Sequence, residues 1–566
     1  MHATAIGETN VKTGPTVPRL STLLPGAVAL KLVLLFVLAW NSRFVMDEFW
    51  QLGQSKFLFD GYFDTIWPGK AVGYAFFYKP AHWIGWNAGS TMLAGRLLTS
   101  LLGCGTLAMV YACARTLGED KTRSLLVVLV LLGFSTFMER IFRTISEPLA
   151  VFFAVAALLA LLRGNADRPV RIVVAGVLAG LSFLATQKAI YFDVALGLAL
   201  VGDALATRRL AVGMVRGTWL VAGWLLPVTA YCLVFGGADP LPVLDNLLMV
   251  PADIATRGGA EAYGGLRLYV WQTLSRNAVL YAACFAGLAV ALARFSNLET
   301  KERIALIFTL VVAVLVFTHS EPWPYVFIMA LPFLALWPMR AYDRLALDSP
   351  YRRLAFIALA ASIALSFATN LYYLRIGNRA QLDLVARAEA MLQPSDTYFD
   401  GIGMLPDRRE STPLWLDKRR YLITLNEGEA SVAYRGLRDA PPKLLISSYR
   451  LDAIRPVIDP LIRDRYVAIS PNIRITGRQL HSGASQSFDP PVAGRYALYG
   501  LDGSKLSGEI EIDGASFTTP VDLAPGKKTV RLRRGAGEAY LLPDGLAEGD
   551  VKPGPDDPDL FRDVYN

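Results

Sequence analysis

The sequence LLPGAVALKLVLLFVLAW, residues 23–40, is followed a few residues later by the acidic pair Asp47-Glu48. An apolar run of this kind is typical of a helix that crosses a membrane, which needs about 20 residues. Two adjacent carboxylates just beyond such a span are unfavourable unless they have a function. The beginning of the chain therefore predicts a membrane protein with an acidic group at one membrane face.

The composition of the 566-residue chain also fits a polytopic membrane protein. Hydrophobic residues make up 53% of the chain, more than a soluble enzyme of this size normally contains. The formal net charge is +8, but the basic residues lie in short loops and form no basic face with interleaved aromatic residues. Nucleic acid is therefore not an expected partner. The four cysteines lie inside apolar runs and are interpreted as buried apolar residues.

Eleven apolar runs are candidate membrane spans, and membrane lipids are expected to surround them. Their approximate bounds are 23–41, 91–114, 124–138, 147–162, 170–186, 189–206, 217–235, 277–293, 303–318, 323–339 and 354–373. With the N-terminus in the cytoplasm, the cytoplasmic loops carry 18 Lys and Arg residues and the opposite loops carry 10. This bias predicts a multi-pass protein of the inner (cytoplasmic) membrane, and the odd span count places the C-terminus outside.

The composition divides the chain into four parts. Residues 1–22 are polar and contain two prolines, which is typical of a disordered cytoplasmic tail. Residues 23–375 predict an all-α polytopic membrane bundle, in which residues 42–90 form the first long outer loop. Residues 376–485 mix buried strands with helices and predict a soluble α/β region outside the cytoplasm. Residues 486–566 contain short strands separated by Asp-Gly turns, which predicts a small extracytoplasmic β-sandwich.

Polar residues with possible chemical roles gather on the outer side of this topology. The candidates are Asp47, Glu48, Gln51, Lys79, Arg143, Glu147, Lys188, His319, Glu321 and Trp323. Several also have structural explanations, because acids can start a helix, lysines can reach the membrane interface, and Arg143 can pair with Glu147 one turn later. Their one-sided distribution favours a site at the outer membrane face over a transport path at mid-depth.

Three of these segments resemble known motifs. Met46-Asp47-Glu48-Phe49-Trp50-Gln51 is similar to the Pro-Asp-Glu-x-x-Gln motif of the dolichyl-phosphate-mannose mannosyltransferases. Segments 143–147 and 319–323 lie where that family has its Arg-Thr-x-Ser-Asn and His-Lys-Glu-Glu-Arg-Phe motifs. The spacing from the acidic pair to Tyr78-Lys79-Pro80 is similar to that in the bacterial aminoarabinose transferases and protein O-mannosyltransferases. The membrane part of the chain thus resembles the GT-C superfamily of integral-membrane glycosyltransferases.

This resemblance implies transfer of a sugar, mannose or another hexose or pentose, from a polyprenyl-phosphate donor. The acceptor would be an extracytoplasmic glycan, lipid or protein, and the reaction a single inverting step. Asp47 would be the general base and Glu48 its support, although the order of the two acids stays open. The donor phosphate would be held by Lys79, Arg143 and Lys188, and the sugar or acceptor pocket would contain Gln51, Glu147, His319, Glu321 and Trp323.

The sequence leaves other functions open. A flippase or transporter for a lipid-linked sugar would use polar residues at mid-depth, for which Arg96 and Asp193 are candidates. An oligosaccharide ligase or polymerase would use a lipid-pyrophosphate donor. A non-catalytic envelope protein with a transferase fold is a third alternative. No Walker loop or paired metal-binding histidines occur in the sequence, and an outward site would have no nucleotide available, so no nucleotide cofactor is expected. A metal is not required if the leaving group is a monophosphate held by cations.

Overall fold

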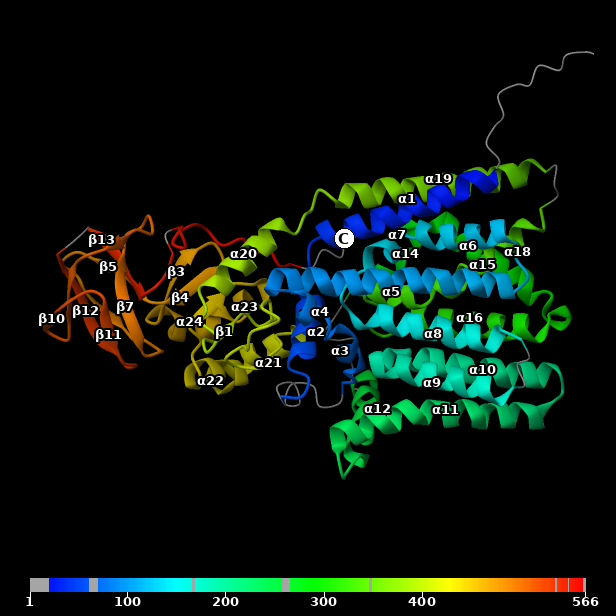
Figure 1. Ribbon diagram of the computed structural model, residues 1–566, viewed down its shortest axis with the longest axis horizontal. Coiled ribbons are helices and arrows are strands. Elements are labelled where there is room, and N and C mark those ends of the chain that lie inside the picture. The colour runs from blue at the N-terminus through cyan, green and yellow to red at the C-terminus, as the bar shows by residue number, and fades with distance from the viewer. Residues whose placement is uncertain are drawn as a thin grey trace, which may run out of the picture.

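A bundle of long helices continues at one end into a C-terminal part that contains the strands, as the computed structural model in Figure 1 shows. The structure describes residues 20–60, 70–164, 168–256, 265–345, 349–534, 537–547 and 549–562. Most of the tail that was predicted to be disordered, residues 1–22, lies outside these residues. Helix α1 begins at Leu20.

The bundle consists of long helices that are apolar around most of their circumference, as is typical of helices that cross a membrane. In chain order they are α1 (Leu20–Asn41), α5 (Ala88–Thr116), α6 (Lys121–Gly133), α8 (Ser146–Leu162), α9 (Pro169–Ala185), α10 (Ile190–Ala206), α11 (Leu210–Gly236), α15 (Ala278–Leu292), α16 (Thr300–Phe317) and α19 (Pro350–Tyr373). A short turn, η2 (Phe295–Asn297), precedes α16.

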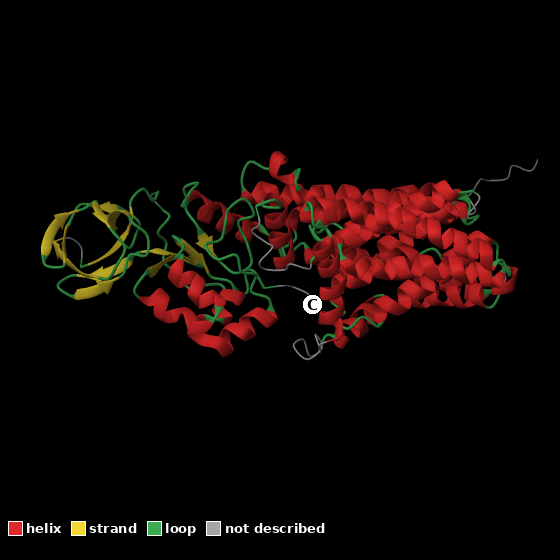
Figure 2. Ribbon diagram, turned by 90° about the horizontal axis from the view of Figure 1, so that it is seen from below, coloured by secondary structure: helices red, strands yellow, loops and turns green. Residues whose placement is uncertain are grey.

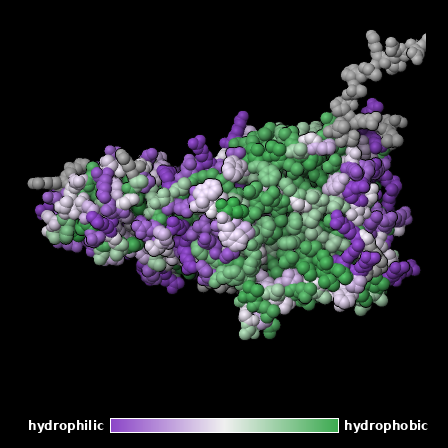
Figure 3. Space-filling view, viewed as in Figure 1, coloured by the Kyte–Doolittle hydropathy of each residue, from purple (hydrophilic) through white to green (hydrophobic). Residues whose placement is uncertain are grey.

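The chain is a polytopic membrane protein, although the predicted count of eleven spans is not confirmed. Among the described residues, five helices are long and apolar enough to cross a membrane: Leu23–Asn41, Ala88–Thr116, Gln187–Ala206, Leu210–Gly236 and Pro350–Tyr373. The pair Arg267–Arg276 and Ala278–Leu292, bent by 91°, would make a sixth span. Helices α8 and α9 are apolar but shorter. Figure 3 shows the broad apolar band on this part of the molecule, next to the more polar C-terminal part.

The segment predicted to span the membrane at 323–339 is not one helix. It forms η3 (Pro324–Met329), α17 (Leu331–Leu334) and α18 (Pro338–Tyr342). A proline lies at the start of each piece, and proline interrupts a helix because it lacks the N–H that the helix needs. Residues 326–339 are buried, so this apolar run fills the interior of the bundle instead of facing lipid.

Helices α9 and α11 approach each other closely through glycines. A Cβ atom on Gly176 would lie 2.2 Å from the Leu220 carbonyl oxygen, and one on Gly223 would lie 2.2 Å from the Val173 carbonyl oxygen. Small residues allow membrane helices to bring their backbones into contact in this way. This contact fixes α11 beside α9, where the two helices form part of a cavity wall.

Short helices cover the end of the bundle that faces the C-terminal part (Figure 1). Three of them belong to the first long loop: α2 (Met46–Lys56), α3 (Gly73–Tyr78) and α4 (Ala81–Ile84). The others are α7 (Ser135–Arg140), η1 (Gln187–Ala189), α12 (Leu241–Thr256) and α14 (Arg267–Arg276). Gly73 lies against α9, because a Cβ atom there would be 2.5 Å from the Leu184 carbonyl oxygen.

The first C-terminal unit is a four-stranded sheet with helices beside it. The strand order is β1-β2-β4-β3, with β1 and β2 parallel and the other pairs antiparallel. The strands are β1 (Tyr398–Phe399), β2 (Leu444–Ile446), β3 (Tyr466–Ser470) and β4 (Ile473–Thr476). The helical elements are α20 (Arg379–Ala390), α21 (Lys418–Glu427), η4 (Gly428–Ala430), α22 (Val432–Asp439), α23 (Tyr449–Ala453) and α24 (Arg455–Arg463).

The second C-terminal unit is a β-sandwich, seen as the strand-rich end of Figure 2. Its sheets have the orders β10-β9-β12-β6 and β11-β7-β13-β5, with β8 beside β7. Leu480, Ile510, Val530 and Leu541 fill the core between the sheets. The unit begins at residue 478, a few residues before the predicted boundary at 486. The strands are β5 (Arg478–His481), β6 (Ser485–Phe488), β7 (Gly494–Tyr499), β8 (Lys505–Leu506), β9 (Glu509–Ile512), β10 (Ala515–Thr518), β11 (Val521–Leu523), β12 (Lys528–Arg534) and β13 (Glu538–Pro543).

Candidate functional site

The acidic pair lies in the first turn of α2. Val45 has an extended backbone, and its N–H donates to Glu48 Oε1 at 3.1 Å, which closes the first turn. Acids are favourable here because the N-terminus of a helix carries partial positive charge. The two side chains have different surroundings, since Glu48 is fully buried and Asp47 is half-buried.

Glu48 is fixed in a buried ion cluster. Arg96 donates to both carboxylate oxygens, with Nε and Nη2 each at 2.7 Å, and Arg143 Nη1 donates to Oε1 at 2.9 Å. The Thr144 N–H adds a bond of 3.2 Å. Burial works to raise the pKa of Glu48, but the charges and hydrogen bonds of the two arginines lower it to about 2. Glu48 is therefore ionised and engaged on all sides.

The same cluster joins the end of α1 to α5. Arg96 Nη1 donates to the carbonyl oxygens of Ala39 at 3.0 Å and Ser42 at 2.6 Å. Arg143 Nη1 donates to the Arg43 carbonyl oxygen at 3.0 Å. Arg96, which a transport mechanism would place on a mid-depth path, thus has a structural partner. An arginine inside an apolar helix requires an acidic or polar partner. The position of Arg96 within an apolar run could therefore have indicated such a partner from the sequence.

Asp47 is on the side of α2 that carries a second group of charges, centred on Lys70. The Lys70 ammonium lies 4.1 Å from the centre of the Trp50 ring. Burial, together with the charge of Lys188, lowers the pKa of Lys70 from 10.5 to about 8. The carboxylates of Asp47, Glu147 and Asp417 act in the opposite direction, so all three lie within electrostatic reach of this ammonium.

Lys188 and Glu147 form a direct pair in this group. Lys188 Nζ lies 2.8 Å from Glu147 Oε1 and 4.4 Å from the centre of the Tyr325 ring. Glu147 is buried in the first turn of α8, where Ser146 Oγ also donates to it at 3.3 Å. Arg143 and Glu147 do not form the ion pair with each other that the sequence suggested. Arg143 instead pairs with Glu48, and Glu147 pairs with Lys188.

Lys79 lies elsewhere in the loop. Its ammonium is 5.6 Å from the centre of the Phe59 ring, and it is half-buried. Lys70, in the same loop, is a lysine whose pKa the Asp47 carboxylate raises. In the sequence, Lys70 directly follows Pro68-Gly69. A Pro-Gly pair is typical of a turn, so this local pattern does not distinguish Lys70 as a binding residue.

The segment 319–323 lies beside this group. His319 Nδ1 and Tyr191 Oη are 2.7 Å apart. Burial, with the charges of Lys188 and Arg267, lowers the pKa of His319 to about 4, so the ring is neutral near pH 7. Glu321 Oε1 accepts from Arg419 Nη2 at 3.0 Å, and the Trp323 ring lies 5.9 Å from that of Tyr269.

Gln51 is buried in α2, and its side-chain oxygen has no hydrogen-bond partner among the residues that the structure describes. The described residues also contain no group of three His, Cys, Asp or Glu side chains arranged to hold a metal ion. All four cysteines are free, and three of them are buried.

The C-terminal part contributes side chains that no local pattern indicated. The Trp415 ring lies 5.0 Å from the Trp50 ring. The Asp417 carboxylate raises the pKa of Lys70, and Arg419 forms an ion pair with Glu321. Through Trp415 and Arg419, segment 415–419 therefore contacts both α2 and segment 319–323. These contacts join residues more than 90 positions apart, with no spacing rule to predict them.

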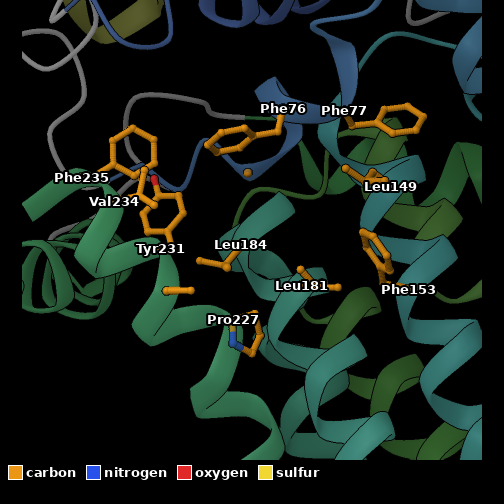
Figure 4. A pocket seen from close by; sticks show the side chains of 12 residues that line it. Phe76, Phe77, Leu149, Phe153, Leu181, Leu184, Pro227, Tyr231, Val234 and Phe235 are labelled. Carbon is orange, nitrogen blue, oxygen red and sulfur yellow. The ribbon is translucent and has the colours of Figure 1, made fainter.

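An apolar cavity of about 520 Å³ opens between α3, α8, α9 and α11. Phe76, Phe77 and Phe235 lie at the end nearest α3, and Pro227 lies at the other (Figure 4). Gly73 lines this cavity and follows Lys70 by three residues. The charged group and the cavity therefore share neighbouring residues of the first long loop.

Parts of the chain match family models. Residues 422–475 match DUF7056 and residues 478–543 match DUF7055, both described as domains of unknown function. None of the curated proteins compared with the chain matches it.

Several solved structures have a similar fold. The crystal structure of ArnT from Cupriavidus metallidurans bound to undecaprenyl phosphate is 15% identical, with a TM-score of 0.54, over 80% of this chain and 97% of that one. Its apo state is 15% identical, with a TM-score of 0.51, over 81% and 98%. An Archaeoglobus fulgidus oligosaccharyltransferase in the apo form is 13% identical, with a TM-score of 0.49, over 85% and 74%. The resemblance to the GT-C glycosyltransferases is confirmed as a likeness of fold. A specific likeness to mannosyltransferases is not supported.

Proposed function

We propose that this protein transfers a sugar from a polyprenyl-phosphate donor to an acceptor outside the cytoplasm. One observation carries the proposal: Asp47 and Lys188 both lie within electrostatic reach of Lys70, and Gly73, three residues after Lys70, lines an apolar cavity of about 520 Å³. A carboxylate can serve as a base, ammonium groups can hold a phosphate, and an apolar cavity can take a lipid chain.

Asp47 is the general base of the proposed reaction. It accepts the proton of an acceptor hydroxyl, whose oxygen forms a bond to the anomeric carbon of the donor sugar. The bond between that carbon and the phosphate oxygen breaks, and the lipid phosphate leaves with the electron pair, which inverts the anomeric centre. Glu48 is unsuited to this role because two arginines hold it ionised and buried. Its role is to fix α2, and through α2 the position of Asp47.

Lys70 and Lys188 hold the phosphate as its charge increases. This assigns to Lys70 the role that the sequence suggested for Lys79, and it gives Arg143 a structural role beside Glu48. The polyprenyl chain lies in the apolar cavity, whose volume is typical of ligand pockets. The undecaprenyl phosphate named for the similar ArnT structure supports a donor of this chemical class.

The remaining predicted residues form the surroundings of the sugar or acceptor. Glu147 orients Lys188, the neutral His319 offers a hydrogen bond, and Glu321 joins segment 319–323 to Arg419. Gln51 and Trp323 are retained as pocket candidates. We assign this end of the bundle, with the C-terminal part, to the periplasmic or extracytoplasmic side, and the excess of basic residues in the opposite loops supports this orientation.

A transfer assay tests the proposal. Purified protein in detergent is given a panel of radiolabelled polyprenyl-phosphate sugars, with Asp47→Asn beside the wild type and Asp239→Asn as the control. Asp239 is an exposed acid after α11. We expect release of sugar from one donor, its loss in Asp47→Asn, and no change in the control. Turnover of lipid-pyrophosphate donors alone would favour the ligase. Translocation of lipid-linked sugar in vesicles without any turnover would favour the flippase.

A further inference from the structure

Three buried polar side chains beside the charged group have hydrogen-bonding atoms without a partner. On α2, the side-chain oxygen of Gln51 and both amide atoms of Gln54 have no hydrogen-bond partner among the residues that the structure describes. On α3, the same is true of the Tyr74 hydroxyl. Gln51 is 4% exposed, Gln54 1% and Tyr74 0%. A buried polar group in this state destabilises the fold, so it requires an explanation.

The two glutamines lie on the face of α2 that carries Asp47. Residues 47, 51 and 54 are separated by four and three positions, which places them on one side of an α-helix with 3.6 residues per turn. They extend over about 10 Å of the helix axis, because each residue adds about 1.5 Å. A ligand that lies along this face next to Asp47 therefore also meets Gln51 and Gln54.

Tyr74 borders the same group from α3, which packs against α2. The Lys70 ammonium lies 4.1 Å from the centre of the Trp50 ring on α2 and 6.0 Å from the centre of the Tyr74 ring. Burial raises the pKa of Tyr74 well above its usual range, and the carboxylates of Glu147 and Asp47 act in the same direction. The Tyr74 hydroxyl therefore keeps its proton, and it can both donate and accept a hydrogen bond.

The chemistry of these atoms requires a ligand with hydroxyl groups. The side-chain oxygens of Gln51 and Gln54 can only accept, so the ligand must supply a hydrogen. An ionised phosphate ester has no hydrogen to donate, and an apolar lipid chain has none either, so neither part of the donor satisfies these oxygens. A sugar hydroxyl both donates and accepts, which matches the amide of Gln54 and the hydroxyl of Tyr74.

We propose that Gln54 and Tyr74, together with Gln51, form a subsite that binds the hydroxyl groups of the donor sugar. This inference rests on the proposed function. A donor phosphate held at Lys70 places its sugar beside α2, with the anomeric carbon near Asp47 and the hydroxyls of the ring toward the two glutamines and Tyr74. Binding then satisfies buried groups that have no partner in the described part of the protein, so the subsite selects donors whose hydroxyls reach these groups.

Gln381 of α20 has the opposite arrangement and provides a matched comparison for stability. It is fully buried, its Oε1 accepts from the Phe44 N–H at 2.8 Å, and its Nε2 donates to the carbonyl oxygens of Phe44 at 3.2 Å and Leu560 at 2.9 Å. Gln381→Met breaks these bonds, so it should lower the melting temperature. Gln54→Met and Tyr74→Phe remove atoms that have no partner, so they should leave the melting temperature unchanged or raise it.

Ligand binding separates a sugar subsite from a structural role. The probes are undecaprenyl phosphate without a sugar and undecaprenyl phosphate that carries mannose, glucose or arabinose, each titrated against the full chain in detergent. Gln54→Met and Tyr74→Phe should each weaken binding of the preferred sugar donor about tenfold, the effect of one or two hydrogen bonds, and leave binding of the bare lipid phosphate unchanged. Tyr281→Phe in α15, which also removes a buried hydroxyl, is the control and should change neither.

Two results would overturn the inference. One is an equal loss of affinity for the sugar donor and the bare lipid phosphate in Gln54→Met and Tyr74→Phe. The other is a fall in melting temperature in Gln54→Met as large as that in Gln381→Met. The titrations need no turnover and can be made in Asp47→Asn protein, so they decide the sugar subsite even if Asp47 is not the base. Selective sugar-donor binding without any transfer by the wild type would instead remove the proposed function and keep the subsite.

Discussion

Replacement of Lys70 is the sharpest test of the charged group beside Asp47. With a pKa of about 8, Lys70 is mostly an ammonium at pH 7 and mostly neutral at pH 9. A neutral amine cannot hold a phosphate by charge, so kcat/KM for the donor should fall about tenfold for each pH unit above 8. Lys70→Arg should remove this decline, because arginine stays charged throughout. Lys70→Met should lower kcat/KM at every pH.

The expected pH dependence follows from the burial of the Lys70 side chain. A fall in pKa from 10.5 to about 8 means that the site disfavours the ammonium form by about 3 kcal/mol relative to water. A bound donor phosphate supplies the negative charge that reverses this effect. The alkaline decline should therefore appear in kcat/KM, which reports the free enzyme, and move to higher pH in kcat, which reports the complex.

The assay is donor turnover from pH 6 to 10, with Lys79→Met as the comparison. Lys79 is in the same loop, but its ammonium lies over Phe59, so its removal should keep the decline near pH 8. If Lys79→Met removed the decline and Lys70→Met kept it, the assignment of the phosphate to Lys70 would be refuted.

Three further changes have definite expected outcomes. Arg96→Met should lower the free energy of unfolding by about 3–5 kcal/mol, because it leaves the Glu48 charge buried without its main partner, and melting in detergent measures this. Burial raises the pKa of Glu410 well above the ordinary glutamate value of 4.5, so the contribution of Glu410 to stability is full below pH 4.5 and is lost as the pH rises through the raised pKa. Glu410→Gln should therefore melt with less pH dependence. Gly73→Leu should weaken donor binding, seen as a raised KM, because its side chain meets Leu184 at the cavity wall.

The sequence predicted the helical membrane part and the strand-rich end, because long apolar runs and short alternating segments are local signals. It predicted the span count less well, since an apolar run can be buried inside a bundle as well as exposed to lipid. Segment 323–339 shows the difference: its prolines divide it into short pieces, and its side chains fill the interior.

In the candidate site, the sequence indicated the acidic pair but not the different surroundings of its two members. Asp47 and Glu48 are neighbours in the chain, yet only the fold brings Arg96 and Arg143 to one of them. The choice between Lys70 and Lys79 likewise depends on which face of the loop turns toward α2. Trp415 and Asp417 had no local signal at all, because their partners lie in the first long loop.

The position of the base depends on contacts from both parts of the molecule. On the bundle side, Glu48 fixes the first turn of α2 through Arg96 of α5 and through Arg143, which lies between α7 and α8. On the other side, Tyr449 Oη lies 2.6 Å from Met46 Sδ, and the Phe561 ring lies 5.9 Å from that of Phe49. A carboxylate that must meet a hydroxyl within hydrogen-bond distance requires such restraint. The C-terminal part is therefore expected to affect the transfer step itself, in addition to any role in binding the acceptor.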